Sequence, residues 1–251
     1  MMQQIPPVNT QTAIFTQFPE LVVGLSGRTG GVSPEPLGMN LSFSVGDDEP
    51  NVIRNRELFF GSLGLQMNQM AVQGQVHGTT VRVVTHAGRY EETDGLITQT
   101  PGIFLTVSIA DCQPVLLYDP VSHTVAGIHS GWRGTEGRIL ERAISIMREQ
   151  CAVRPENIVA WLGPAARGCC YEVGEEVAAK FNERFLTRAP GKKTRLDIAN
   201  ANYEMLLGLG LKRPNIALDD RCTIHNPADF HSYRRDGARS GRMMAVIGLR
   251  S

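Results

Sequence analysis

The chain has 251 residues, of which 42% are hydrophobic, and its 25 basic side chains balance its 25 acidic ones. A chain of this length buries about 70–75% of its unfolded surface, which predicts one domain over residues 1–251 with 1–19 as a short N-terminal extension. Without net charge there is no long-range attraction to nucleic acid or to an anionic membrane. Residues 1–19 lack the basic start and the continuous apolar core of a secretion signal, so a cytoplasmic protein is expected.

Short runs rich in Val and Ile, bordered by turn-forming residues, predict strands along the whole chain. These runs lie at 21–25, 80–84, 103–110, 114–118, 124–129, 157–163 and 242–249. Amphipathic spacing predicts helices at 51–63, after an N-cap at Thr135, at 174–187 and at 197–210. Strands and helices alternate without a regular βαβ rhythm, which indicates an α/β or α+β fold with mixed sheets.

The turn-rich segment "DPVSH" at 119–123 joins two of these strands and predicts an antiparallel hairpin. The first strand begins just after Cys112, and the second ends at His129. Antiparallel pairing returns the chain to its starting end, so the hairpin brings Cys112 and His129 together.

Two chemistries fit this pair of residues. In the first, His129 activates a Cys112 thiolate as a nucleophile. In the second, both bind zinc or copper, with His77 of "GQVHG" as a third ligand and a vacant fourth position for a catalytic water. Spacings of 35 and 17 residues along the chain are weak evidence, and a buried apolar Cys with an ordinary His is the alternative.

The other cysteines indicate no disulfide framework. The chain has five, an odd number, in a sequence that shows no export signal, namely Cys112, Cys151, Cys169, Cys170 and Cys222. Neighbouring side chains point to opposite sides of an extended chain, so a site shared by Cys169 and Cys170 is not expected.

Charged residues in glycine-rich loops form a second group of candidates. Arg28 stands beside Gly30 and Gly31, and Arg133 precedes the helix predicted from Thr135. Such loops and helix starts can hold an anion such as phosphate. Arg234 lies in "SYRRDG", and Asp111 directly precedes Cys112. Surface ion pairs for the arginines and a turn role for Asp111 are the structural alternatives.

Seven motifs resemble, in order, those of the YfiH-like family, also called the laccase-domain or multicopper polyphenol oxidoreductase family. The motifs are "GRTGGVS", "QVHG", "ADCQPVLLYD", "AGIHSGWRGT", "WLGPAA", "CCYEVG" and "FHSYRRDGARSGRM", and the resemblance runs from about residue 20 to 250. The family includes the human immune-metabolic protein FAMIN and bacterial proteins labelled peptidoglycan editing factor.

The resemblance implies a single-domain layered sandwich with mixed sheets flanked by helices. It further implies one Zn²⁺ per chain, bound by His77, Cys112 and His129, with Cu²⁺ as the alternative metal. The implied activity is phosphorolysis of adenosine, inosine, guanosine and methylthioadenosine, together with deamination of adenosine. The implied partners are therefore a purine nucleoside and phosphate, and the oligomeric state, monomer or weak dimer, stays open.

The expected pocket lies beside this metal. Its expected substrate-binding residues are Arg28, Asn40, Gln75, Arg133, Glu172 and Arg234. Catalytic roles are expected for Cys112, His129, His77 and Asp111, and either Asp111 or Glu172 would move protons during deamination. An arginine would hold the phosphate that attacks C1′ of the ribose.

Three rival functions remain open from the residues. A cysteine amidase that edits peptidoglycan precursors would use Cys112 as nucleophile and His129 as base. A laccase-like polyphenol oxidase would need several copper centres. A non-catalytic zinc protein would need a fourth soft ligand beside the three. The sequence also departs from the family pattern at Gly27, Ser130, 165–168 and His231, and His231 is expected to alter the pocket wall.

Overall fold

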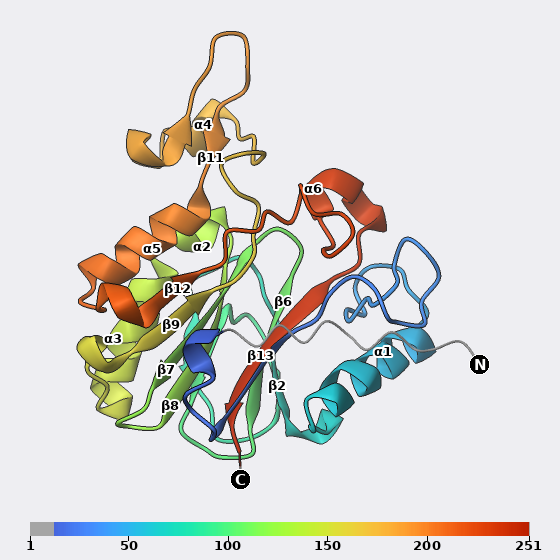
Figure 1. Ribbon diagram of the computed structural model, residues 1–251, viewed down its shortest axis with the longest axis vertical. Coiled ribbons are helices and arrows are strands. Elements are labelled where there is room, and N and C mark those ends of the chain that lie inside the picture. Colours follow the sequence, from blue (N-terminus) through green and yellow to red (C-terminus); the bar gives the residue numbers. More distant parts are fainter. Residues whose placement is uncertain (1–12, 251) are drawn as a thin grey trace.

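Two β-sheets lie face to face in the computed structural model, which describes residues 13–250 (Figure 1). The five-stranded sheet has the order β1 (Leu21–Leu25), β13 (Met243–Leu249), β6 (Phe104–Ile109), β2 (Met70–Gln73) and β4 (Gly88–Tyr90). The six-stranded sheet has the order β12 (Ile216–Leu218), β9 (Val159–Leu162), β7 (Gln113–Asp119), β8 (Thr124–Ser130), β5 (Gly95–Thr98) and β3 (Val81–Val83). Both sheets mix parallel and antiparallel pairs.

Helices cover the outer face of each sheet. The helix α1 (Glu49–Ser62) packs on the five-stranded sheet, and α3 (Ile139–Cys151) and α5 (Ile198–Gly208) pack on the six-stranded one (Figure 1). Alternate residues of β7 explain this layering, because Leu116 faces the other sheet and Leu117 faces the helices. The predicted mixed α/β layered sandwich is confirmed, with apolar cores between the sheets and under the helices.

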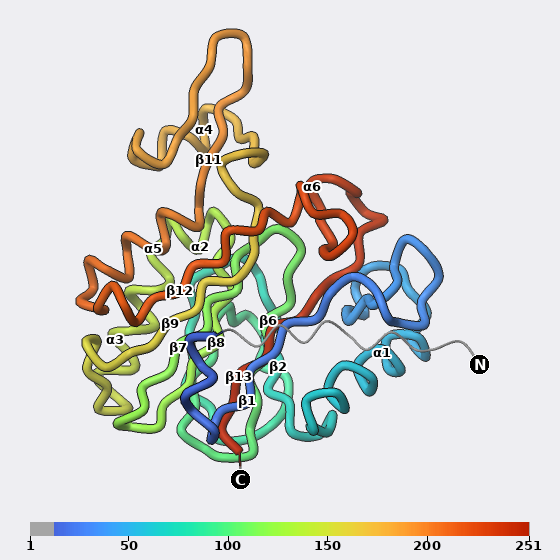
Figure 2. Tube along the Cα trace, viewed as in Figure 1, coloured from blue at the N-terminus to red at the C-terminus, as the bar shows by residue number. Residues whose placement is uncertain are grey.

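The first and last strands of the described chain pair with each other at one edge of the five-stranded sheet. Strand β1 pairs antiparallel with β13 along its whole length, from Leu21 opposite Leu249 to Leu25 opposite Ala245, and Figure 2 shows the two strands side by side. Part of the predicted extension lies outside the described residues. The remainder packs on the body, since Ala13–Phe15 form a 3₁₀ turn with Phe15 buried and Phe18 contacts the Tyr118 ring.

Three long-range connections between the two sheets lie at one end of the sandwich. The loop 74–80 leads from β2 to β3, 110–112 leads from β6 to β7, and 219–242 leads from β12 to β13. The strand registers place all three at the same end as the close of β8. Residues far apart in the sequence therefore meet there.

Two predicted helices differ from the structure. The segment 174–187 is a short helix α4 (Glu175–Ala178), a 3₁₀ turn and a two-residue strand, β10 (Leu186–Thr187), paired with β11 (Arg195–Leu196). Its apolar spacing reflects packing in a small separate core rather than one continuous helix. This segment projects from the body of the molecule above α5 (Figure 1).

Thr135 is not an N-cap. It lies inside α2 (Trp132–Glu136), where its hydroxyl donates to the Gly131 carbonyl at 3.0 Å. The long helix α3 begins only after Arg138, whose left-handed backbone (φ 58°) separates the two helices. Within residues 13–250, each helix is too short or too polar to cross a lipid bilayer.

Candidate metal centre

His77, Cys112 and His129 converge at the end of the sandwich where the connections cross. The side-chain nitrogen and sulfur atoms that could bind a metal all lie within 4.8 Å of one another. The two imidazole rings are 5.0 Å apart and nearly perpendicular, at 76°. His129 is buried, Cys112 is half-buried and His77 is exposed, so the cluster opens to solvent on the His77 side.

The β7–β8 hairpin brings two of these side chains to one face. The register pairs Pro114 with His129 and Gln113 with Ser130, so Cys112 lies opposite Gly131. Gly131 leaves the space that the sulfur occupies, since a Cβ atom there would lie 2.7 Å from Cys112 Sγ and 3.4 Å from His77 Cδ2. The predicted convergence of Cys112 and His129 is confirmed.

His77 reaches the hairpin from the loop between the two sheets, with a left-handed backbone at φ 59°. Asp94 fixes this loop, because its carboxylate accepts hydrogen bonds from the backbone N–H groups of Val76, His77 and Gly78 at 3.1, 3.0 and 2.8 Å. The loop is therefore shaped around one buried carboxylate.

Asp94 also orients His129. Its Oδ1 lies 2.8 Å from His129 Nδ1, and its backbone carbonyl accepts from the His129 N–H at 2.7 Å. This hydrogen bond directs the other ring nitrogen, Nε2, toward the cluster, as carboxylates do for metal-binding histidines. Sequence reasoning missed Asp94, because "ETDG" at 92–95 has only the composition of a turn.

Cys112 and His129 each favour the charged form of the other. Burial opposes ionisation of the Cys112 thiol, but His129 and His77 together lower its pKa to about 6. Burial likewise opposes the charge on His129, but Cys112 and Asp94 raise its pKa to about 9. Without a metal, the pair is a thiolate beside an imidazolium at neutral pH.

A transition metal fits these residues. One thiolate and two imidazoles are the donor set of a catalytic zinc site with three protein ligands and one open position. Asp94 supplies the carboxylate that commonly hydrogen-bonds a metal-binding histidine. The exposed His77 side gives solvent or substrate access to the open position. The same donors also suit copper.

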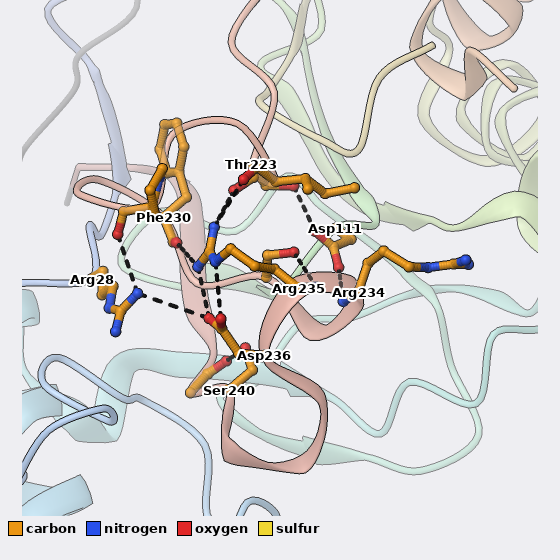
Figure 3. Close-up of polar contacts among 12 residues, drawn as sticks. Arg28, Asp111, Thr223, Phe230, Arg234, Arg235, Asp236 and Ser240 are labelled. Atoms are coloured by element: carbon orange, nitrogen blue, oxygen red, sulfur yellow. Dashed lines mark hydrogen bonds and ion pairs between the residues drawn. The ribbon is translucent and has the colours of Figure 1, made fainter. Parts of the chain in front are cut away.

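The Asp111 carboxylate accepts hydrogen bonds on both of its oxygens. Thr223 Oγ1 donates to Asp111 Oδ1 at 2.7 Å, and the Arg234 backbone N–H donates to Oδ2 at 2.6 Å (Figure 3). Asp111 is buried and adopts a left-handed backbone at φ 92°. The carboxylate therefore links the loop 110–112 to the loop 219–242.

Of the predicted anion-binding arginines, Arg234 is joined to the residue before Cys112, since its backbone N–H donates to Asp111. Its guanidinium covers the Tyr171 ring at 5.1 Å and donates to the Glu172 carbonyl at 2.8 Å. Arg28 instead faces Asp236 at 3.8 Å and Glu35 at 3.4 Å, as Figure 3 shows for Asp236.

The remaining predicted pocket residues have mainly structural contacts. The Gln75 amide both donates to and accepts from the Ser108 backbone at 2.8 Å. Buried Asn40 accepts from the Arg242 N–H and donates to Asp47, both within 3.0 Å. The Glu172 and Arg133 side chains are exposed, and Arg133 stacks on Trp132 within α2, not ahead of a helix.

Tyr171 and Arg242 are two neighbours of the cluster that sequence reasoning did not select. Burial, followed by the charge of Cys112, raises the pKa of Tyr171 to about 12, so its phenol stays protonated. Burial also lowers the pKa of Arg242, against the nearby charges of Asp111 and Cys112. His231 is fully buried next to Gly241, so it is not exposed to solvent beside the cluster.

Cys169 and Cys170 do share a site, contrary to the prediction. The chain is a tight turn at 168–170 rather than an extended strand, so the two sulfurs lie 3.5 Å apart. Cys222 and His225 complete a group whose ligand atoms all lie within 4.8 Å of one another.

A comparison with known proteins decides the family. Residues 22–250 match the model of the family described as multi-copper polyphenol oxidoreductase laccase. The chain belongs to this family. The YfiH-like resemblance of its motifs is thereby confirmed over nearly the whole chain.

Similar proteins include a purine nucleoside phosphorylase of Deinococcus radiodurans, 42% identical over 88% of this chain and 87% of that protein. The purine nucleoside phosphorylase YlmD of Bacillus subtilis is 30% identical over 92% of this chain and 89% of its own. Among solved structures, YlmD from Geobacillus stearothermophilus superimposes with a TM-score of 0.90 at 30% identity, covering 98% of this chain and all of that one.

Proposed function

We propose that this protein is a zinc-dependent purine nucleoside phosphorylase that also deaminates adenosine. The observation that carries the proposal is the His77, Cys112 and His129 cluster, oriented by Asp94 and open on one side. Relatives named purine nucleoside phosphorylase, at up to 42% identity, support the reaction class. Adenosine, inosine, guanosine and methylthioadenosine are the proposed substrates.

His77, Cys112 and His129 would hold the zinc. When bound, the metal supplies a Lewis acid that polarises a substrate oxygen or lowers the pKa of a water molecule. Asp94 keeps the His129 ring fixed, and Gly131 keeps room for the Cys112 sulfur. Since the ligands come from three rigidly connected segments, little reorganisation is needed during the reaction.

In phosphorolysis, a phosphate oxygen forms a bond to C1′ of the ribose while the bond from C1′ to the purine nitrogen breaks. Arg242 and Arg234 are the cations beside the cluster, and they would hold the phosphate. The partial burial of the Arg242 guanidinium strengthens such an ion pair. Arg28 is turned toward Asp236 and is assigned to the pocket wall.

The departing purine gains negative charge and needs a hydrogen-bond donor. Tyr171 suits this role, because its pKa of about 12 keeps the phenol protonated and its ring lies under Arg234. Asp111 positions the Arg234 backbone and Thr223 rather than carrying the proton itself. A proton relay through Glu172 finds little support, since its side chain is exposed.

A cysteine hydrolase is the second candidate, because Cys112, His129 and Asp94 also have the order of a nucleophile, base and orienting acid. Peptidoglycan precursor editing is the form of this reaction that the family names suggest. His77 separates the two hypotheses: it binds the metal in the first and has no task in the second.

Copper-dependent phenol oxidation, which the family description names, is the third candidate. Four-electron reduction of oxygen calls for several copper centres with many histidine ligands. The chain has six histidines, and the two ligand groups of the described residues use three of them. The small number of histidines therefore favours a single reactive metal centre.

The deciding experiment uses zinc-loaded protein and adenosine, with and without phosphate. Adenine, inosine, hypoxanthine and ribose 1-phosphate are followed by chromatography. We expect base and ribose 1-phosphate only with phosphate, and a fall of at least about a hundredfold in His77→Ala and in Cys112→Ala. His86→Ala, at an exposed histidine, is the matched control. Activity that survives both His77→Ala and chelation but is lost in Cys112→Ala favours a thiol hydrolase instead.

A further inference from the structure

Four potential metal ligands lie together outside the site described above. Cys169 and Cys170 come from the loop that follows β9, and Cys222 and His225 come from the loop that follows β12. Their sulfur and nitrogen atoms all lie within 4.8 Å of one another. None of the four takes part in the proposed phosphorolysis.

Two turns and one strand-like contact assemble this group. The turn at 168–170 folds Cys169 back onto Cys170, and a second turn at 223–225 returns His225 to Cys222. Both the backbone N–H and the side-chain amide of Asn226 donate to the Cys222 carbonyl, at 3.1 and 2.7 Å. The loops are joined where Ala165 bridges Cys222 and accepts from the Thr223 N–H at 3.0 Å.

We propose that Cys169, Cys170, Cys222 and His225 form a second, structural zinc site. Three thiolates and one imidazole are a complete tetrahedral ligand set for zinc, with no open position for a substrate. Zinc–sulfur bonds of about 2.3 Å place tetrahedral sulfurs about 3.8 Å apart. The 3.5 Å between Cys169 Sγ and Cys170 Sγ is close to that value without being a covalent bond.

The surrounding charges suit such a centre. Zinc with three thiolates carries one net negative charge, and binding releases the thiol protons to solvent. Guanidinium groups line both loops: Arg195 donates to the Cys169 carbonyl at 2.8 Å, and Arg235 donates to the Thr223 and Ile224 carbonyls at 2.9 and 3.2 Å. Cys169 and His225 are exposed, which gives the ion an entry path from solvent.

The second site would stabilise the loops that surround the first metal centre. Thr223, next to Cys222, donates to Asp111, and Asp111 also accepts from the Arg234 backbone (Figure 3). Asp111 directly precedes Cys112 of the first cluster. A metal that joins the 169–170 turn to the 222–225 turn would thus fix the positions of Arg234 and of the loop that contains Cys112.

The first test is the number of bound metals. Protein purified under reducing conditions and loaded with zinc is analysed by mass spectrometry for metal per chain. We expect about two zinc ions in the wild type, and about one in both Cys112→Ser and the double variant Cys169→Ser with His225→Ala. Cys151→Ala, at a buried cysteine of α3 outside both groups, should retain two.

Cobalt substitution tests the site without relying on variants. Three thiolates on cobalt give much stronger thiolate-to-metal charge-transfer absorption than one, and this band should persist in Cys112→Ser and vanish in the double variant. A wild type that binds one zinc, all of it lost in Cys112→Ser, overturns the proposal. A wild type in which Cys169, Cys170 and Cys222 are all reduced thiols but which still binds no second zinc on reloading overturns it as well.

These outcomes are separate from those of the proposed phosphorolysis. Failure of the purine assay with two zinc ions bound would refute the reaction and leave the structural site intact. An active enzyme that binds only one zinc would support the reaction and refute the structural site. If the structural site is right, the double variant should keep the metal at His77, Cys112 and His129 but unfold at a lower temperature than Cys151→Ala.

Discussion

Asp94 joins the two histidines of the candidate metal centre, since it accepts from the His129 ring and from the backbone N–H of His77. Asp94→Asn keeps the shape but removes the charge that favours the Nε2-directed form of His129. We expect zinc affinity at this centre to fall by about 10–100-fold, the usual effect of losing such a partner. Competition with a chromophoric chelator measures the change.

Glu91→Gln is the matched control for this prediction. Glu91 is also an acidic residue of the same loop, but it is exposed and pairs with Arg89 at 2.6 Å. Its replacement should leave zinc affinity unchanged. Equal effects of both substitutions would show that general loop charge, not the hydrogen bond to His129, sets the affinity.

Gly131 is required for steric reasons, because its backbone (φ −81°) is one that any residue adopts. A methyl group there would lie 2.7 Å from Cys112 Sγ. Gly131→Ala should therefore weaken zinc binding at least tenfold and cost about 1–3 kcal/mol of stability, as overpacking does. Gly61→Ala, in α1 with open space around it, should instead leave both unchanged or raise stability by about 0.5–1 kcal/mol.

Cys112 of the metal-free protein should react as a thiolate down to about pH 6, the value to which His129 and His77 lower its pKa against the effect of burial. The thiolate is the reactive form, so alkylation by iodoacetamide should be fast above this pH and lost as the pH falls through it. His129→Ala removes the main positive charge and should move the midpoint upward. Peptide mass spectrometry follows each cysteine separately.

Cys170 is the internal control in the same sample. Burial and its sulfur neighbours raise its pKa to about 12, so its alkylation should stay slow from pH 5 to 9. Cys112 alkylation that still increases above pH 8 would show that no ion pair with His129 forms.

At the scale of elements, the hairpin was predictable because two apolar runs flank the turn-rich segment 119–123, and antiparallel pairing returns the second run to the start of the first. The ends of β7 and β8, and hence the meeting of Cys112 and His129, follow from this local pattern. His77 and Asp94 come from connections that cross between sheets, and no local pattern fixes where such loops land. His77 was proposed as a third ligand from its residue type and the family resemblance, whereas Asp94 was found only in the folded chain.

The same distinction explains the wrong predictions. The spacing in 174–187 is compatible with a helix, but these residues line a small core of their own and the chain turns after Ala178. The alternation rule that separated Cys169 from Cys170 holds for strands, whereas the chain turns at that point. Predictions from local sequence were wrong in both places because tertiary packing determines the backbone conformation there.

Asn202 of α5 couples the helix layer to the hairpin, since its amide donates to Gln113 Oε1 at 2.9 Å and to Ser130 Oγ at 3.1 Å. All three side chains are fully buried. Asn202→Ala would leave the Gln113 oxygen without a donor and should cost about 2–3 kcal/mol, or roughly 5–10 °C in Tm. Calorimetry of this variant beside Asn51→Ala, on α1, measures the difference. An equal loss in both variants would count against the coupling.

For the whole molecule, the placement of both ligand groups at one end of the sandwich separates stability from function. The sheets supply the cores. The metal ligands come from the loops 74–80, 110–112, 163–174 and 219–242 and from the close of β8. The hairpin turn at 119–123 lies at the opposite end. Metal binding should therefore stiffen one end of the sandwich and leave the other unchanged.

Hydrogen exchange with mass spectrometry tests this division. Zinc loading should slow amide exchange in 74–80, 110–113 and 129–134, and also in 168–172 and 222–226 if the second site is filled. Exchange in the turn at 119–123 should not change, because no ligand lies near it. Uniform slowing along the chain would instead indicate that zinc raises global stability, as any ligand of the native state does. Slowing confined to the first three segments would leave the His77 centre as the only one that zinc orders.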